Sequence, residues 1–133
     1  MTIEYRQTRD FTEEDLRRLF LSVGWELGRY PKRLVTAMRN STHVISAWDG
    51  VIGLVRALDD GATIAFLHYV LVDPKYQGRH IGDELMKRIM KNFTDLLHVK
   101  VIPVRSEDHH VLRALRIPPV RQLLGNGEEE HAE

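Results

Sequence analysis

The chain has 133 residues, of which 43% are hydrophobic and 29% charged, and these values predict one globular domain with a hydrophobic core. Basic and acidic residues balance at 19 each, so no overall charge favours nucleic acid or an anionic membrane. Cysteine is absent, which excludes disulfides and thiolate chemistry and fits a reducing compartment. Because no apolar run approaches the length of a membrane span and no signal-peptide core follows the first residues, we expect a cytoplasmic protein without a membrane partner.

The first forty residues predict a short strand and two helices. The opening residues alternate between polar and apolar, as a strand does. Thr12 has the position of an N-cap, with Asp15 three residues on, and apolar residues continue at helical spacing to Val23. Pro31 suits the first turn of a second helix, which stops near Asn40. We therefore expect the order strand, helix, helix.

The middle of the chain changes to strand periodicity. Asp49-Gly50 and Asp59-Asp60-Gly61 are tight-turn sequences, and each lies between runs rich in β-branched and aromatic residues. Short turns of this kind join antiparallel neighbours. The three predicted strands are HVISAW, VIGLVRAL and ATIAFLHYVLV.

The second half predicts a helix, a strand and a last helix. Apolar residues recur every four positions from Ile81 to Phe93, which is typical of an amphipathic helix. Residues 98–104 alternate as a strand, and because a helix precedes them, this strand lies parallel to the previous one. We expect a last helix at residues 106–116. We predict an α/β (α+β) fold with a mostly antiparallel central sheet, in one domain of residues 1–124 followed by an acidic, disordered tail at 125–133.

The stretch YQGRHIG stands where the third of these strands ends and the amphipathic helix begins. The first N–H groups of a helix have no intrahelical partner, so such a turn can bind an anion. Gly78 and Gly82 let a ligand approach the main chain, and Arg79 adds positive charge. A phosphate-like ligand fits these features. The alternative is a turn softened by glycine that binds nothing.

VLVDPKYQGRHIGDELM, from Val70 to Met86, closely resembles the acetyl-CoA signature of the GNAT N-acetyltransferase superfamily. The order of the predicted elements resembles that fold over roughly residues 1–105. The resemblance implies an N-acetyltransferase that moves an acetyl group from acetyl-CoA to a small-molecule or peptide amine by direct attack, without a metal. It further implies that the acetyl-CoA contacts come from Val70, Leu71, Val72, Gln77, Gly78, Arg79, His80, Ile81 and Gly82.

Two departures from the family pattern stand out. His80 takes the place of the first motif glycine, so we expect a positive φ there at a cost of about 1–2 kcal/mol. After HVKVIPV the family carries an aromatic pair and a final hairpin, whereas no tyrosine follows Tyr76 in this chain. The expected fold therefore lacks the C-terminal hairpin, and the usual acid for the departing thiolate is missing. A GNAT-like CoA-binding or interaction module without turnover is the alternative function.

The exposed sheet edge that a missing hairpin leaves predicts a homodimer through the C-terminal region, residues 106–124. The alternative is that these residues fold back over their own sheet and leave a monomer. Nucleic-acid binding is a weaker reading, because the basic residues near the turn have acidic neighbours and no interleaved aromatic residues. We expect no nucleic-acid partner.

Candidate catalytic residues lie just before the signature. His68 is a candidate base for the amine, and Tyr69 is the nearest remaining phenol; strict alternation predicts that they point to opposite faces of the sheet. The alternative is that His68 only satisfies its hydrogen bonds as a strand residue and that Tyr69 only packs against its neighbours. Trp25, Glu26 and Tyr30 could wall an acceptor pocket or cap the core. No ligand spacing indicates a metal site.

Overall fold

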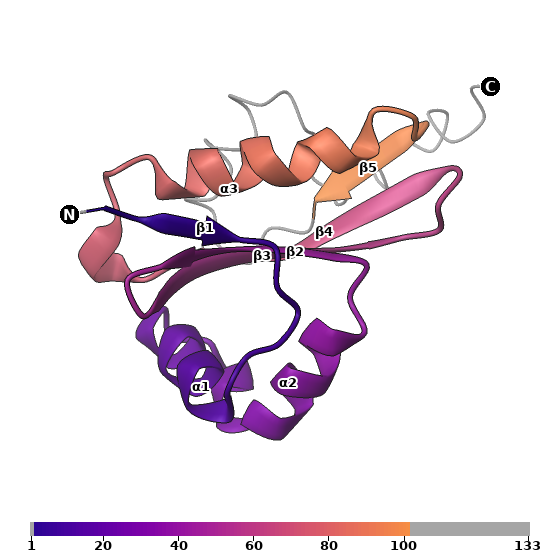
Figure 1. Cartoon of the computed structure of the whole chain (residues 1–133). Helices are drawn as coiled ribbons and strands as arrows, with labels where there is room; N and C mark the ends of the chain where they lie inside the picture. Colours follow the sequence, from indigo (N-terminus) through magenta and orange to yellow (C-terminus); the bar gives the residue numbers. More distant parts are fainter. Residues whose placement is uncertain (1, 102–133) are drawn as a thin grey trace.

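The computed structural model describes residues 2–101, in which one mixed sheet separates two layers of helices (Figure 1). The sheet has five strands in the order β1-β2-β3-β4-β5, antiparallel except for the parallel pair β4 and β5. The strands are β1 (Glu4–Arg6), β2 (His43–Trp48), β3 (Val51–Asp59), β4 (Ile64–Val72) and β5 (His98–Val101). The predicted fold class, a mostly antiparallel sheet flanked by helices, is confirmed.

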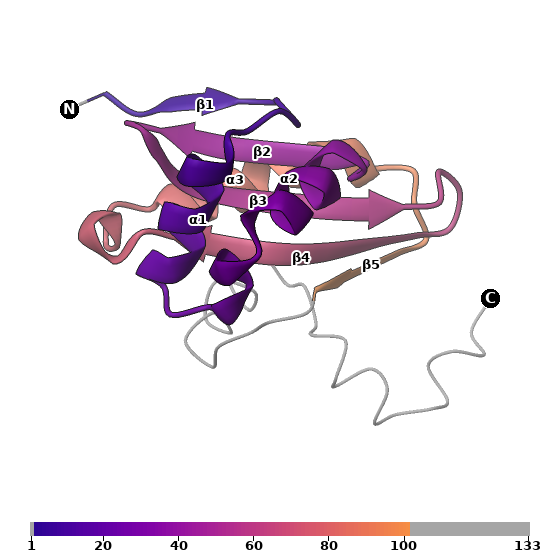
Figure 2. The same ribbon diagram turned by 90° about the horizontal axis from the view of Figure 1, so that it is seen from below.

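The N-terminal layer contains α1 (Glu13–Ser22), the 3-10 helix η1 (Glu26–Arg29) and α2 (Pro31–Arg39). Thr12 caps α1 as predicted, since its hydroxyl oxygen accepts a hydrogen bond from the Asp15 N–H at 3.1 Å. Pro31 stands in the first turn of α2, where its missing N–H costs no hydrogen bond. Figure 2 shows α1 and α2 side by side across β2, β3 and β4.

The opposite layer is α3 (Ile81–Met90), followed by the 3-10 turn η3 (Lys91–Phe93). Its apolar stripe packs on the sheet through Ile81, Leu85, Met86 and Ile89, all buried. The sheet thus has a core on each face, one under α3 and one under α1 and α2. Within residues 2–101, no helix is long and apolar enough to cross a membrane.

A β-bulge interrupts the pairing of β3 with β4. Leu54 faces Leu71 and Arg56 faces His68, so β4 has one more residue than β3 between these two pairs. Tyr69 lies in the bulge with a positive φ of 59°, a conformation that costs a non-glycine residue about 1–3 kcal/mol and persists only when its surroundings enforce it.

The bulge exchanges the faces of β4. Before it, Ala65 and Leu67 pack in the core under α3; after it, Tyr69 and Leu71 pack in the core under α1 and α2. His68 therefore shares a face with Tyr69, and their rings stack at 4.2 Å between centroids. Our prediction that these two side chains point to opposite faces was wrong, because alternation holds only for a strand without an inserted residue.

The parallel pairing of β4 and β5 confirms the prediction from their helical connection. It joins Ile64 to His98 and ends at Leu67 and Val101. The remaining predictions for the C-terminal region lie outside the described residues, and they concern the end of the strand to 104, the helix at 106–116, the missing hairpin, the dimer contact and the tail.

Candidate functional site

The turn between β4 and α3 is tied to the sheet through Asp73 and Gln77. The Asp73 N–H donates to the Ile52 carbonyl at 2.7 Å, and the Asp73 carboxylate accepts from the Lys75 N–H at 2.9 Å. This bond caps the 3-10 helix η2 (Pro74–Tyr76). The Gln77 side-chain amide then donates to the Val72 carbonyl at 3.3 Å. These contacts hold the turn in place beside the end of β4.

Tyr76 joins the same turn to the β2–β3 hairpin. Its hydroxyl donates to the Asp49 carboxylate at 2.9 Å. That hydrogen bond, followed by smaller effects of burial and of the charge of Asp49, raises the pKa of Tyr76 above its ordinary value. The Arg79 guanidinium lies over the Tyr76 ring, 5.4 Å from its centroid. The β2–β3 hairpin therefore supports the turn that carries Gly78.

Two residues of the turn have left-handed backbones. Gly78 has φ 83° and His80 has φ 61°. The positive φ expected for His80 is confirmed, and this residue is the N-cap of α3 without a side-chain cap bond of its own. The His80 imidazole instead contacts the Asp83 carboxylate, with 3.3 Å between Nδ1 and Oδ2.

The start of α3 leaves an open backbone cradle. The first intrahelical bond joins the Glu84 N–H to the His80 carbonyl at 3.1 Å, so the N–H groups of residues 81–83 have no partner within the helix. A β-carbon added at Gly78 would meet nothing within 4 Å, and one added at Gly82 would lie 3.8 Å from the Val72 side chain. Uncrowded N–H groups at a helix N-terminus fit a phosphate group.

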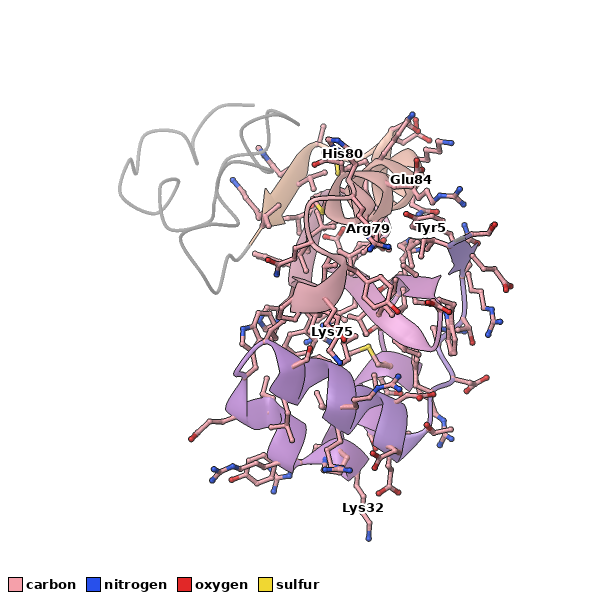
Figure 3. All side chains as sticks on the ribbon, turned by 90° about the vertical axis from the view of Figure 1, so that its left-hand side faces the viewer. Tyr5, Lys32, Lys75, Arg79, His80 and Glu84 are labelled. Atoms are coloured by element: carbon pink, nitrogen blue, oxygen red, sulfur yellow. The ribbon has the colours of Figure 1, made fainter. Side chains whose placement is uncertain are left out.

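Two basic side chains, Lys75 and Arg79, and the His80 imidazole belong to the turn that precedes α3. Figure 3 shows Lys75, Arg79 and His80 on the same side of the molecule, with His80 beside α3, Lys75 near the layer of α1 and α2, and Arg79 between them. All three are exposed. Asp83 and Glu84 in the first turn of α3 offset part of their charge. A phosphate ligand would therefore depend mainly on the backbone donors.

The remaining signature residues support the cradle from below. Ile81 is buried in the core under α3, and Val70 and Val72 are partly buried against that core, whereas Leu71 is buried in the core under α1 and α2. The side chains of Val70, Val72 and Ile81 therefore pack β4 against α3. Any contact that these residues make with a ligand must therefore come chiefly from their backbone groups.

A second cluster lies at the bulge, on the face of α1 and α2. The Tyr69 ring meets Phe20 edge-on at 5.3 Å and Trp25 at 6.2 Å between centroids. Arg56, which is only 9% exposed, places its guanidinium 4.3 Å from the Tyr69 ring centroid. Its Nη2 lies 3.3 Å from Nδ1 of His68. Burial, and then the charge of Arg56, lower the pKa of His68 to about 4.

The structure brings Trp25 to Tyr69 but not the other predicted acceptor residues. Trp25 is buried, and its indole N–H has no hydrogen-bond partner in the described part of the chain. Glu26 is exposed on η1, and Tyr30 is 53% exposed with its ring near the Arg33 guanidinium. The candidate residues thus divide between the buried cluster and the surface beside it.

Arg56 is the site residue that the sequence reasoning missed. It interrupts the apolar run VIGLVRAL, and alternation places it on the same face as Leu54, in the interior. A charged residue at an interior strand position is the signal that could have identified it. Among residues 2–101, no group of three or more His, Cys, Asp or Glu could hold a metal ion.

Comparisons with known proteins agree with this geometry. A sequence profile of the Acetyltransferase (GNAT) family matches residues 6–115. An uncharacterized N-acetyltransferase ycf52-like of Prochlorococcus marinus is 31% identical over 101 residues, which are 71% of this chain and 55% of that protein. The chain therefore spans little more than half the length of this relative.

Solved structures share the architecture. A GNAT-family acetyltransferase from Streptococcus pneumoniae TIGR4 superposes with a TM-score of 0.75 at 27% identity, covering 88% of each chain. The aminoglycoside N-acetyltransferase AAC(6')-Iy, solved in complex with CoA, covers 88% of each chain with a TM-score of 0.65. Its identity is 18%, so that likeness concerns the fold. The matched profile spans most of the sequence, and the chain belongs to the acetyltransferase (GNAT) family.

Proposed function

We propose that the protein is an N-acetyltransferase that transfers the acetyl group of acetyl-CoA to a primary amine by direct attack. The observation that carries this proposal is the cradle at the start of α3, where Gly78 and His80 have left-handed backbones and the first N–H groups are open. Membership of the acetyltransferase (GNAT) family supports acetyl-CoA as the ligand of this cradle.

In this proposal the pyrophosphate of acetyl-CoA lies on the turn and the acyl end lies along β4. The turn residues are Gln77, Gly78, Arg79, His80, Ile81 and Gly82, and the β4 residues are Val70, Leu71 and Val72. The bulge supports the placement of the acyl end along β4. Because β4 has an extra residue there, the pairing with β3 skips Tyr69 and Val70 and leaves backbone groups available beside the cluster.

The chemistry requires little of the protein beyond positioning. The amine nitrogen forms a bond to the thioester carbon, the carbon–sulfur bond breaks, and the amine loses a proton as the thiol of CoA is released. The thiol has a pKa of about 8.5, so it leaves readily. An ammonium with a pKa near 10.4 must first lose its proton, which costs about 4–5 kcal/mol at neutral pH. Holding the free amine next to the thioester carbonyl lowers the remaining part of the activation barrier.

We assign the acceptor side to the cluster at the bulge. His68 and Tyr69 are the proposed catalytic residues, because they immediately precede Val70 in the chain and share one face. Trp25 packs against Tyr69 and would form the wall of the acceptor pocket, with Glu26 and Tyr30 at its rim. An exposed carboxylate at Glu26 would attract a cationic amine.

A second candidate function is a CoA-binding module without turnover. The sequence favours it in one respect, since no tyrosine follows Tyr76. The two functions differ in release of CoA. Purified protein with acetyl-CoA and a panel of small amines, amino acids and lysine peptides should release CoA faster than hydrolysis alone. Tight acetyl-CoA binding with no amine-dependent release across this panel would favour the module.

The cytoplasmic location and the homodimer remain predictions of the sequence. Light scattering tests the homodimer. The full-length protein should have the mass of a dimer at micromolar concentration, and a monodisperse monomer would contradict it.

A further inference from the structure

Arg56 is a buried cation whose described contacts are all neutral. Nη1 lies 3.4 Å from the Ser41 hydroxyl, Nη2 lies 3.3 Å from His68 Nδ1, and the Tyr69 ring lies under the guanidinium. The ion pairs among residues 2–101 do not include Arg56, and its Nε is buried without a partner there. Burial lowers the pKa of Arg56, but guanidinium remains charged at any ordinary pH. Burying this charge without a carboxylate partner among the described residues is energetically costly.

The position of Arg56 is fixed from two sides. It faces His68 directly across the pairing of β3 and β4. On its other side, Ser41 is fully buried just after α2, and its hydroxyl donates to the Ala37 carbonyl at 2.7 Å. The carbonyl end of a helix is its negative end, which favours a cation nearby. The guanidinium is therefore held against the imidazole.

This contact determines where the proton on His68 lies. A guanidinium has five N–H donors and no acceptor, so His68 Nδ1 must contribute its lone pair to the contact. In a neutral imidazole the single proton is then on Nε2. The lone pair that a general base would use is occupied by Arg56, and the free nitrogen carries a hydrogen.

The other groups around His68 are either neutral or positively charged, and a positive charge disfavours protonation of the imidazole. Tyr69 stacks on the imidazole from β4, and Phe20 and Trp25 pack on Tyr69 from the layer of α1 and η1. Arg9 donates to the Ser41 carbonyl at 3.2 Å, which adds a second positive charge near Arg56. Within the described residues, no carboxylate contact opposes these charges at His68.

We propose that Arg56 is a positioning residue that fixes His68 as the neutral Nε2–H tautomer, so that this side of the site presents a hydrogen-bond donor instead of a proton acceptor. Its meaning for catalysis rests on the proposed function. His68 would then donate to an oxygen of one of the substrates, and the proton of the amine would leave through water. This role replaces the role of base that the sequence suggested for His68.

Nitrogen NMR of protein labelled at histidine tests the proposal without any substrate. The His68 signals are assigned by their loss in His68→Gln. We expect the Nε2–H tautomer at neutral pH and no titration of this ring near its ordinary pKa of about 6.5. In Arg56→Met, which keeps a long side chain but removes the donors, both tautomers should appear. The pKa of His68 should rise from about 4 but stay below 6.5, because burial is the larger cause.

Two variants serve as controls. Arg9→Met removes a cation that contacts Ser41 but not His68, so the tautomer should not change. Arg56→Lys keeps a charged donor and should retain the Nε2–H form, which also provides a test should Arg56→Met fail to fold. A wild-type His68 protonated on Nδ1, a midpoint near 6.5, or an unchanged spectrum in Arg56→Met would each overturn the proposal.

Kinetics separate this proposal from the proposed function. Arg56→Met should lower kcat about tenfold, with KM for acetyl-CoA unchanged, because the cradle lies on other residues. If the wild type shows no turnover while His68 has the expected tautomer, the proposed function fails and the role of Arg56 stands. If turnover is normal but His68 carries its proton on Nδ1, the proposed function stands and the role of Arg56 fails.

Discussion

The two ends of the candidate site are built in opposite ways. The cradle at the start of α3 consists of backbone N–H groups on an exposed turn, whose shape depends on Gly78 and His80. The cluster at the bulge consists of side chains packed in the interior around Tyr69. A backbone site can be altered with little effect on the core, whereas a site made of core side chains cannot. Stability and ligand binding should therefore respond separately to mutations at the two ends.

The largest expected effect on stability lies in the cluster. Trp25 is 8% exposed and packs against Phe20 and Tyr69, so Trp25→Ala should lower the free energy of unfolding by about 3–5 kcal/mol. Denaturant unfolding measures this change. Tyr30→Ala, at a residue that is 53% exposed, should change stability by no more than about 0.5 kcal/mol. Equal effects of the two variants would show that Trp25 is not part of the core.

A matched pair of glycines isolates the cradle. Gly78 and Gly61 both have positive φ, at 83° and 76°, and an added β-carbon meets nothing within 4 Å at either. Alanine at each should therefore cost a similar amount of stability, about 1–2 kcal/mol. Gly78→Ala should also weaken acetyl-CoA binding about tenfold, because the turn relaxes away from the shape that exposes its N–H groups. Equal affinity in the two variants would remove the turn from the binding site.

The dependence of stability on pH reports the environment of His68. The unfolded chain binds a proton at this group below about pH 6.5, but the folded protein binds it only below about 4. Between these values the unfolded state binds more protons, so the stability contributed by neutral His68 is present above 6.5 and is lost as the pH falls. The stability difference between wild type and His68→Gln should shrink by about 1 kcal/mol from neutral pH to about pH 5, after allowance for partial exposure. A constant difference would contradict the depressed pKa.

The smallest effect concerns the support of the turn. Tyr76→Phe removes the hydrogen bond to Asp49 on the surface of the protein. It should weaken acetyl-CoA binding about threefold by loosening the turn, with little change in the melting temperature. Tyr30→Phe, an exposed tyrosine distant in the sequence from the turn, should have no effect on binding. If Tyr76→Phe lowers the melting temperature but leaves the affinity for acetyl-CoA unchanged, the hydrogen bond supports the fold and not the binding site.

The two ends also differ in how far the sequence predicted them. The turn was predictable because glycines between a strand pattern and a helix pattern mark such a junction, and the left-handed His80 was expected from the resemblance to the family signature, which has a glycine at that place. The order of elements, the Thr12 cap and the parallel β4–β5 pair were likewise local consequences of periodicity and turn length. All of these depend on short-range rules.

The cluster was not predictable in the same way. Strict alternation separated His68 from Tyr69, but an inserted residue brought them to one face. The sequence of β4 contains no glycine that would indicate a bulge, and the residue with the positive φ is Tyr69. Arg56 became part of the site through its partner on the neighbouring strand, and that pairing depends on the register of the whole sheet. Contacts of this kind are long-range and follow from the assembled fold.

Calorimetric titration of acetyl-CoA into three proteins tests the central claim most directly. The wild type should bind one acetyl-CoA per chain. Gly82→Trp should lose at least about 100-fold in affinity, roughly 3 kcal/mol, because the indole fills the cradle. His68→Gln should bind as the wild type does, since the cradle is made by backbone groups on another segment, and Lys87→Trp, at an exposed position of the same helix, controls for the added ring. No binding by the wild type, or equal binding by Gly82→Trp and Lys87→Trp, would contradict the account.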